Sequence, residues 1–126
     1  MARKEFAFKG KSAEELKKLS MEELVAILPS RQRRSLRRGF TTAQKHLLAR
    51  LKKKDGLETH CRDMIVLPEM IGKTLKIHDG RNFVTVMIQP EMTGHYLGEF
   101  VMTRKKVLHH APGIGATKSS SSLSVK

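Results

Sequence analysis

The sequence has little of what secreted and membrane-spanning proteins depend on. It contains one cysteine, Cys61, which cannot form a disulfide within the chain and therefore favours a reducing compartment. Its apolar runs stay short of the roughly 18 residues that a membrane span needs. The start, MARKEFAFKGKSAEE, lacks the apolar segment of a signal peptide. We therefore expect a soluble protein of the cytoplasm.

Aromatic and acidic residues are also scarce. The 126 residues include no Trp and one Tyr, enough for one small core with 39% hydrophobic residues. They contain 25 Lys and Arg but only 12 Asp and Glu, for a formal net charge of +13. Self-repulsion of this size destabilises a compact chain unless a polyanion neutralises it. Because no apolar segment suits a membrane, nucleic acid is the expected partner.

The positive charge is concentrated in the middle of the chain. Residues 30–62 carry eleven Lys and Arg against two acids, whereas residues 1–29 have a net charge of only +1. The densest stretch, SRQRRSLRRGF, contains five arginines, whose planar donors match phosphate oxygens. A solvated helix face and a nuclear localisation signal are the alternatives, but no acidic residue lies three or four positions away to support a free helix. We predict polyanion contacts at Arg31, Arg33, Arg34, Arg37 and Arg38.

Three segments carry the start signals of helices. SAEE at Ser12–Glu15 and SMEE at Ser20–Glu23 are capping boxes, and the second leads into an apolar run that ends at Pro29. We expect two short helices there, forming a near-neutral arm that docks on protein. Residues 41–54 predict a third helix, capped by one of its first threonines, with a buried stripe of Ala43, Leu47, Leu48 and Leu51.

After Gly56 the hydrophobic pattern changes to that of strands. MIVLP, residues 64–68, predicts one short strand, and residues 74–88 alternate on both sides of the Asp79-Gly80 dipeptide, a strong hairpin signal. A single helical turn is expected over residues 97–100. The predicted fold is α+β: a small three-stranded antiparallel sheet with helices packed on it, an N-terminal helical arm and an extended C-terminal tail. The corresponding domains are 1–29 (arm), 30–110 (RNA-binding core) and 111–126 (flexible tail).

The stretch GHYLGEFVMTRKKVLHH, residues 94–110, allows two interpretations. A metal-dependent hydrolase would use His95, Glu99 and His109 or His110, but three adjacent cations oppose a dication there. RNA binding fits better, because glycines allow close approach of a phosphate or a left-handed turn, cations contact phosphates, and rings stack on bases. We therefore expect no enzyme activity, metal or cofactor, and predict RNA contacts at His95, Tyr96, Arg104, Lys105, Lys106, His109 and His110.

Several blocks of this sequence resemble one known family. They are SLRRG (35–39), PEMIG (68–72), HDGR (78–81), EMTGHYLGEF (91–100) and TR (103–104) with a following histidine. Together they resemble the signature of the universal ribosomal small-subunit protein nineteen, called protein fifteen of the small subunit in eukaryotes. The N-terminal arm and the PGIGATKSS tail look like the archaeal and eukaryotic branch, and an archaeal source is the expectation.

This resemblance implies a structural, non-catalytic component of the small-subunit head. It implies binding to head rRNA near the decoding region and the bridges to the large subunit, with ribosomal proteins thirteen and fourteen nearby and the tail approaching tRNA. Carried onto this chain, the RNA-facing residues would be Arg34, Arg37, Arg38, Lys52, Lys53, Lys54, Arg81, His95, Arg104, Lys105 and Lys106. Lys118 in the tail is predicted to bind RNA as well. A free-standing DNA-binding or chromatin protein is the alternative, although the sequence contains no evident recognition helix.

Overall fold

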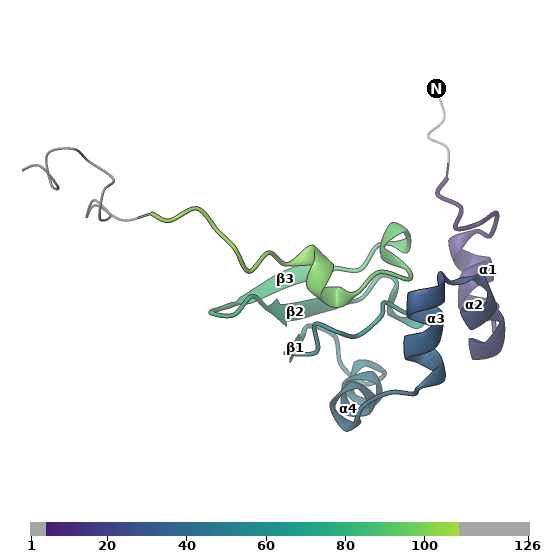
Figure 1. Ribbon diagram of the computed structural model, residues 1–126, viewed down its shortest axis with the longest axis horizontal. Coiled ribbons are helices and arrows are strands. Elements are labelled where there is room, and N and C mark those ends of the chain that lie inside the picture. The colour runs from purple at the N-terminus through teal and green to yellow at the C-terminus, as the bar shows by residue number, and fades with distance from the viewer. Residues whose placement is uncertain (1–4, 109–126) are drawn as a thin grey trace, which may run out of the picture.

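The computed structural model describes residues 5–108, which fold around one three-stranded sheet (Figure 1). The helices are α1 (Ala13–Lys18), α2 (Met21–Ile27), α3 (Ser30–Arg37) and α4 (Thr42–Leu51), and the strands are β1 (Leu57–Thr59), β2 (Thr74–His78) and β3 (Phe83–Met87). Three 3₁₀ turns, Pro68–Met70, Pro90–Met92 and Leu97–Phe100, complete the fold. The α+β class and the turn over residues 97–100 are thus confirmed.

Three of the helices begin with the capping signals that the sequence predicts. Ser12, Ser20 and Thr41 each accept the amide of the residue three positions later, whose side chain accepts the amide of the cap in return. Hydrogen bonds of this kind satisfy amides that have no partner within the helix. Helix α3 was not expected: it follows Pro29 without a side-chain cap and has no acidic residue in its first turn.

The sheet has the order β1-β2-β3 and is mixed, so the antiparallel prediction is wrong for one strand pair. Strands β2 and β3 form the predicted antiparallel hairpin, with Leu75 opposite Val86. Strand β1 instead pairs parallel to β2, with Leu57 beside Leu75. The predicted strand at 64–68 is also wrong, since this segment makes only an isolated bridge from Ile65 to Tyr96. Its apolar run reflects burial: residues 64–68 are all buried.

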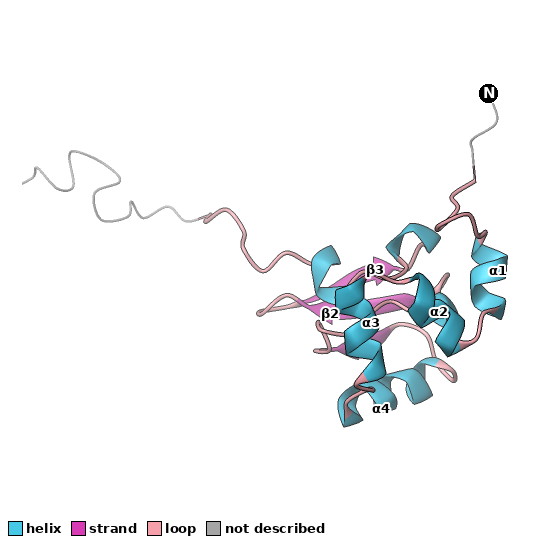
Figure 2. Cartoon of the chain, turned by 45° about the vertical axis from the view of Figure 1, so that its right-hand side comes forward, coloured by secondary structure: helices cyan, strands magenta, loops and turns pink. Residues whose placement is uncertain are grey.

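The helices cover one region of the sheet, and the hairpin tip points away from them (Figures 1 and 2). Leu24 of α2, its C-cap residue Leu28, and Leu47 and Leu51 of α4 join Leu75 and its neighbours in one buried cluster. Truncating such a leucine to alanine typically costs about 2–5 kcal/mol. The apolar stripe of the N-terminal arm, expected to dock on another protein, therefore lies largely inside this chain's own core.

The buried stripe of α4 differs from the predicted one at two positions. Leu47 and Leu51 are buried as expected, but Leu48 is only half-buried and Ala43 is exposed. Gln44 takes the inward position at the first turn, where its side chain accepts the Thr41 amide. Within residues 5–108, no helix is long and apolar enough to cross a lipid bilayer.

Candidate nucleic-acid interface

Helix α3 and its C-cap residue present a row of arginines that form no ion pair with a carboxylate of residues 5–108. Arg31, Arg34, Arg37 and Arg38 are exposed, and a shallow groove runs between them. Within residues 5–108 the ion pairs are Lys76–Glu58, His95–Glu99 and Lys105–Asp79, none of which involves α3. The helix carries basic residues in its last turn, where the dipole favours them, and none of its residues is fully buried. This surface is therefore free to contact a polyanion.

Arg33 differs from the other arginines of α3. Its Nε donates to the carbonyl of Val25 at 3.3 Å, and its Nη2 donates to those of Ala26 and Leu28 at 3.2 and 3.1 Å. These carbonyls lie at the C-terminus of α2, where helix geometry leaves acceptors without partners and the dipole favours a cation. Arg33 therefore ties α3 to α2, and its guanidinium is largely occupied by this contact.

Tyr96 links α3 to the glycine-rich segment. Its hydroxyl lies 3.2 Å from the Ser35 hydroxyl, and the Arg31 guanidinium stands over its ring, 5.4 Å from the centroid. The neighbouring His95 is exposed, and its Nδ1 lies 2.7 Å from Glu99 Oε2. The structure thus brings Arg31, His95 and Tyr96 into one region, as the hypothesis of a joint RNA surface requires.

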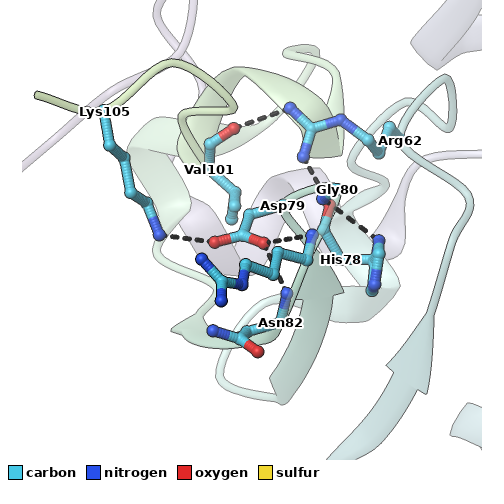
Figure 3. Close-up of polar contacts among 8 residues, drawn as sticks. Arg62, His78, Asp79, Gly80, Asn82, Val101 and Lys105 are labelled. Carbon is cyan, nitrogen blue, oxygen red and sulfur yellow. Dashed lines mark hydrogen bonds and ion pairs between the residues drawn. The ribbon is translucent and has the colours of Figure 1, made fainter. Parts of the chain in front are cut away.

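The tip of the hairpin is built on a buried carboxylate (Figure 3). One oxygen of Asp79 accepts the amides of Arg81 and Asn82 at 2.8 and 2.6 Å, and the other pairs with Lys105 Nζ at 2.5 Å. The hydrogen bond from Lys105, followed by those from Asn82 and Arg81, holds the pKa of Asp79 well below its ordinary value. Lys105, predicted to contact RNA, is thus paired with the turn, while Arg81 remains exposed beside it.

Arg62 fastens the C-terminal segment to the sheet, a role that the sequence did not reveal. Its Nη1 donates to the His78 carbonyl at 2.6 Å, and its Nη2 donates to the Val101 carbonyl at 2.6 Å (Figure 3). The same Nη2 also donates to the Gly98 carbonyl at 2.8 Å. Three carbonyls from two separate parts of the chain therefore meet on one guanidinium. With Lys105, this contact directs the chain beyond Val101 along the side of the hairpin.

The two glycines of this segment serve the packing of the chain itself. Gly94 is buried with a φ of +83°, the left-handed conformation that was one of the two expectations, and a Cβ there would lie 2.8 Å from Leu28 Cδ2. A Cβ on Gly98 would lie 3.0 Å from the Arg62 carbonyl oxygen. Close approach of the chain to itself thus explains both glycines, and the alternative that Gly94 admits a phosphate is wrong because the residue is buried.

The remaining predicted cations are spread more widely. Lys52, Lys53 and Lys54 are exposed beyond the C-terminus of α4, about 15 Å along that helix from its start beside α3. Arg104 and Lys106 are exposed on either side of Lys105. His109, His110 and Lys118 lie outside the described residues. The described part of the chain contains no group of three or more His, Cys, Asp or Glu side chains placed to hold a metal ion.

A small α+β fold that exposes an unneutralised arginine helix defines a class, that of small nucleic-acid-binding proteins. Residues 34–109, more than half of the chain, match the family described as Ribosomal protein S19, and the chain belongs to that family. The match includes α3 from Arg34 onward, α4, the whole sheet and the segment with Tyr96. As a ribosomal protein of this family, the chain is a structural component of the ribosome that binds rRNA and serves translation; the family is not catalytic.

Proposed function

We propose that this protein is a structural constituent of the head of the small ribosomal subunit, near the decoding region and the bridges to the large subunit. Its neighbours there are ribosomal proteins thirteen and fourteen, and its tail approaches tRNA. We assign it to the cytoplasm, and the likeness of its arm and tail sequences supports assignment to the archaeal and eukaryotic branch. The family match supports the ribosomal role, and the finer assignments are what the resemblance of the sequence blocks to that family implies.

The observation that carries this proposal is the unneutralised row of arginines on α3. We assign direct rRNA contacts to a set of residues that expose cations or rings, namely Arg31, Arg34, Arg37, Arg38, Lys52, Lys53, Lys54, Arg81, His95, Tyr96, Arg104 and Lys106. Arg33 and Lys105 position these groups, because their donors are engaged with α2 and with Asp79. We also assign rRNA contacts to His109, His110 and Lys118, which lie outside the described residues.

Binding of this kind is driven by the release of counterions from phosphates. Each cation that meets a phosphate makes the affinity fall more steeply with salt, and six to ten such contacts weaken binding roughly 10³- to 10⁵-fold between about 50 and 200 mM salt. The grooves of A-form RNA hide most base edges from side chains. Recognition therefore depends mainly on the folded shape of the rRNA, which the rigid spacing of α3 and the hairpin tip can match.

The double variant Arg34→Glu with Arg37→Glu tests this proposal. Both side chains are exposed and make no ion pair within residues 5–108, so the fold should survive. We expect weaker binding to small-subunit rRNA and a slope of log affinity against log salt that is shallower by about 2. Lys17→Glu with Lys18→Glu on α1 changes the net charge equally and should leave the slope unchanged. An unaltered slope for the α3 variant would show that these arginines face solvent.

A further inference from the structure

We propose that a depression beside α3 binds a single unpaired nucleotide of the RNA, with a preference for guanine. This inference rests on the proposed function and adds a defined ligand to it. The depression lies between α3, the start of α4 and the segments 62–65 and 96–99, and has a volume of about 840 Å³. Sites for small molecules commonly span about 300–1,000 Å³. One nucleotide fits such a space, whereas an RNA helix would meet only its rim.

Two guanidiniums at this depression suit a phosphate. Arg31 is held in place by the Tyr96 ring, whose hydroxyl is fixed in turn by Ser35. Arg38 is exposed at the C-terminal cap of α3 and lines the same depression. Within residues 5–108, neither side chain donates a hydrogen bond or forms an ion pair. A planar donor that is already oriented, as Arg31 is by Tyr96, binds phosphate oxygens with two parallel hydrogen bonds at a small entropic cost.

The lining also offers flat surfaces for a base. Tyr96 and Phe40 are far apart in the sequence, but both are half-buried and both line the depression. Unpaired bases in RNA stack on aromatic rings of this kind. A base inserted between these groups would carry its phosphate to the rim where Arg31 and Arg38 lie.

Of the two carboxylates on the lining, Asp63 selects the kind of base. Asp63 is exposed and has no ion pair within the described residues, while Glu99 already shares its Oε2 with His95. A carboxylate repels a phosphate but accepts N–H groups from a base. Guanine presents its N1–H and N2–H₂ side by side, which matches the two oxygens of one carboxylate, whereas uracil offers a single N–H between two carbonyls. The chemistry of Asp63 therefore favours guanine over uracil.

Titration of the full chain with mononucleotides, followed by amide chemical shifts, tests this assignment. We expect 5′-GMP at millimolar concentration to shift the amides of Gly39 and Gly98, which line the depression. 5′-UMP should bind roughly fivefold or more weakly, because a well-formed pair of base contacts discriminates by about 1–3 kcal/mol. Inorganic phosphate should shift the amide resonance of Gly39 more than that of Gly98, because Gly39 is next to Arg38, which is expected to bind the phosphate.

Three variants separate the parts of the site. Asp63→Asn should abolish the preference for GMP over UMP, and Arg38→Gln should weaken both nucleotides while leaving guanosine, which lacks the phosphate, unaffected. Arg50→Gln is the matched control, because Arg50 is exposed on α4, does not line this depression and has no assigned rRNA contact. It should leave the affinity for mononucleotides unchanged.

Three results would overturn the inference: no shift at Gly39 and Gly98 with GMP, an Asp63→Asn variant that keeps the preference, or protection of these amides by a neighbouring ribosomal protein without RNA. The last result would assign the depression to a protein contact. If nucleotides fail to bind while Arg34→Glu with Arg37→Glu still lowers the salt slope on rRNA, only the nucleotide site is refuted. If the slope is also unaltered, the proposed function falls as well.

Discussion

Arginine has two distinct roles in this chain, and the difference lies in what each guanidinium contacts. Arg33 and Arg62 donate to backbone carbonyls and hold separate segments together. Arg34 and Arg37 are exposed and make no such contact within residues 5–108. Residue type alone cannot separate these roles, because all four lie in the same basic region of the sequence.

Asp79 should make the stability of the fold dependent on pH. Its pKa is lowered from the ordinary value of 3.8 by Lys105 and by the amides of the turn, so the unfolded chain takes up the proton first as the pH falls. The stabilisation from Asp79 is therefore complete well above pH 3.8 and is lost progressively below it. Urea unfolding of the protein at about pH 6 and about pH 3 measures this loss.

Asp79→Asn tests the origin of that dependence. Asparagine keeps an oxygen for the amides of Arg81 and Asn82, and Asn-Gly suits a tight hairpin turn, so the turn should be retained. The ion pair with Lys105 is lost, and we expect lower stability at about pH 6 with a smaller further decrease on acidification. The side chain of Asp79 is only 3% exposed, which leaves little solvent to replace Lys105. If the free energy of unfolding of this variant decreased as steeply with falling pH as that of the unmodified protein, this account would be contradicted.

Alanine substitutions at Gly94 and Gly72 can be compared to measure the effect of one close contact, that between residue 94 and Leu28. Their φ angles are +83° and +87°, so alanine meets the same backbone strain at both, about 1–2 kcal/mol. Only at Gly94 does the added Cβ meet Leu28, which is 1% exposed and has little room to move. We expect Gly94→Ala to cost about 1–3 kcal/mol more than Gly72→Ala in denaturant unfolding. Equal costs would show that the core around Leu28 adjusts freely.

Among the elements, those with local signals could be predicted and those that depend on distant contacts could not. Capping boxes at Ser12 and Ser20 identified α1 and α2, the apolar stripe of residues 41–54 identified α4, and the Asp79-Gly80 turn identified the hairpin. Strand β1 has only three residues, too few for a sequence pattern, and its strand conformation depends on parallel pairing with β2. Helix α3 lacks a capping side chain and an acidic first turn, and it is held by contacts such as that of Arg33.

The residues of the candidate site also fall into two groups: those whose role could be predicted from the sequence and those whose role depends on distant contacts. The excess of arginines and the ring of Tyr96 can be recognised from residue type and spacing. The contacts of Arg62 join residues 16, 36 and 39 positions away, and that of Lys105 joins residues 26 positions away. No local pattern encodes such separations. For this reason the sequence could not show that Arg33 and Lys105 already have hydrogen-bond partners within the chain.

The link between α2 and α3 can be measured with two substitutions on neighbouring residues. Arg33→Met removes three hydrogen bonds to the end of α2 and should lower the free energy of unfolding by about 1–3 kcal/mol, the usual range for hydrogen bonds from a charged group. Arg34→Met removes the same charge from an exposed position and should change stability by less than about 0.5 kcal/mol. Thermal and urea unfolding distinguish the two. Similar losses in both variants would refute the capping role of Arg33.

In the whole molecule, cations lie both on α3 and around the hairpin tip, where the segment after Val101 leaves the fold (Figure 1). The core fixes the geometry between these two regions, because α2, α4 and the sheet share one buried cluster. A rigid body with charged groups at fixed separations suits a folded RNA, whose phosphates are also held in place. Stability and recognition are thus coupled through the same packing.

The most direct test of the central claim is ultraviolet crosslinking of RNA to this protein in intact small subunits, with the crosslinked peptides identified by mass spectrometry. We expect the protein to sediment with small subunits and its crosslinks to fall on α3 and on the exposed cations beside the hairpin tip. Crosslinks that avoid α3, or a protein recovered wholly outside small subunits, would contradict the claim that its arginines are neutralised by rRNA.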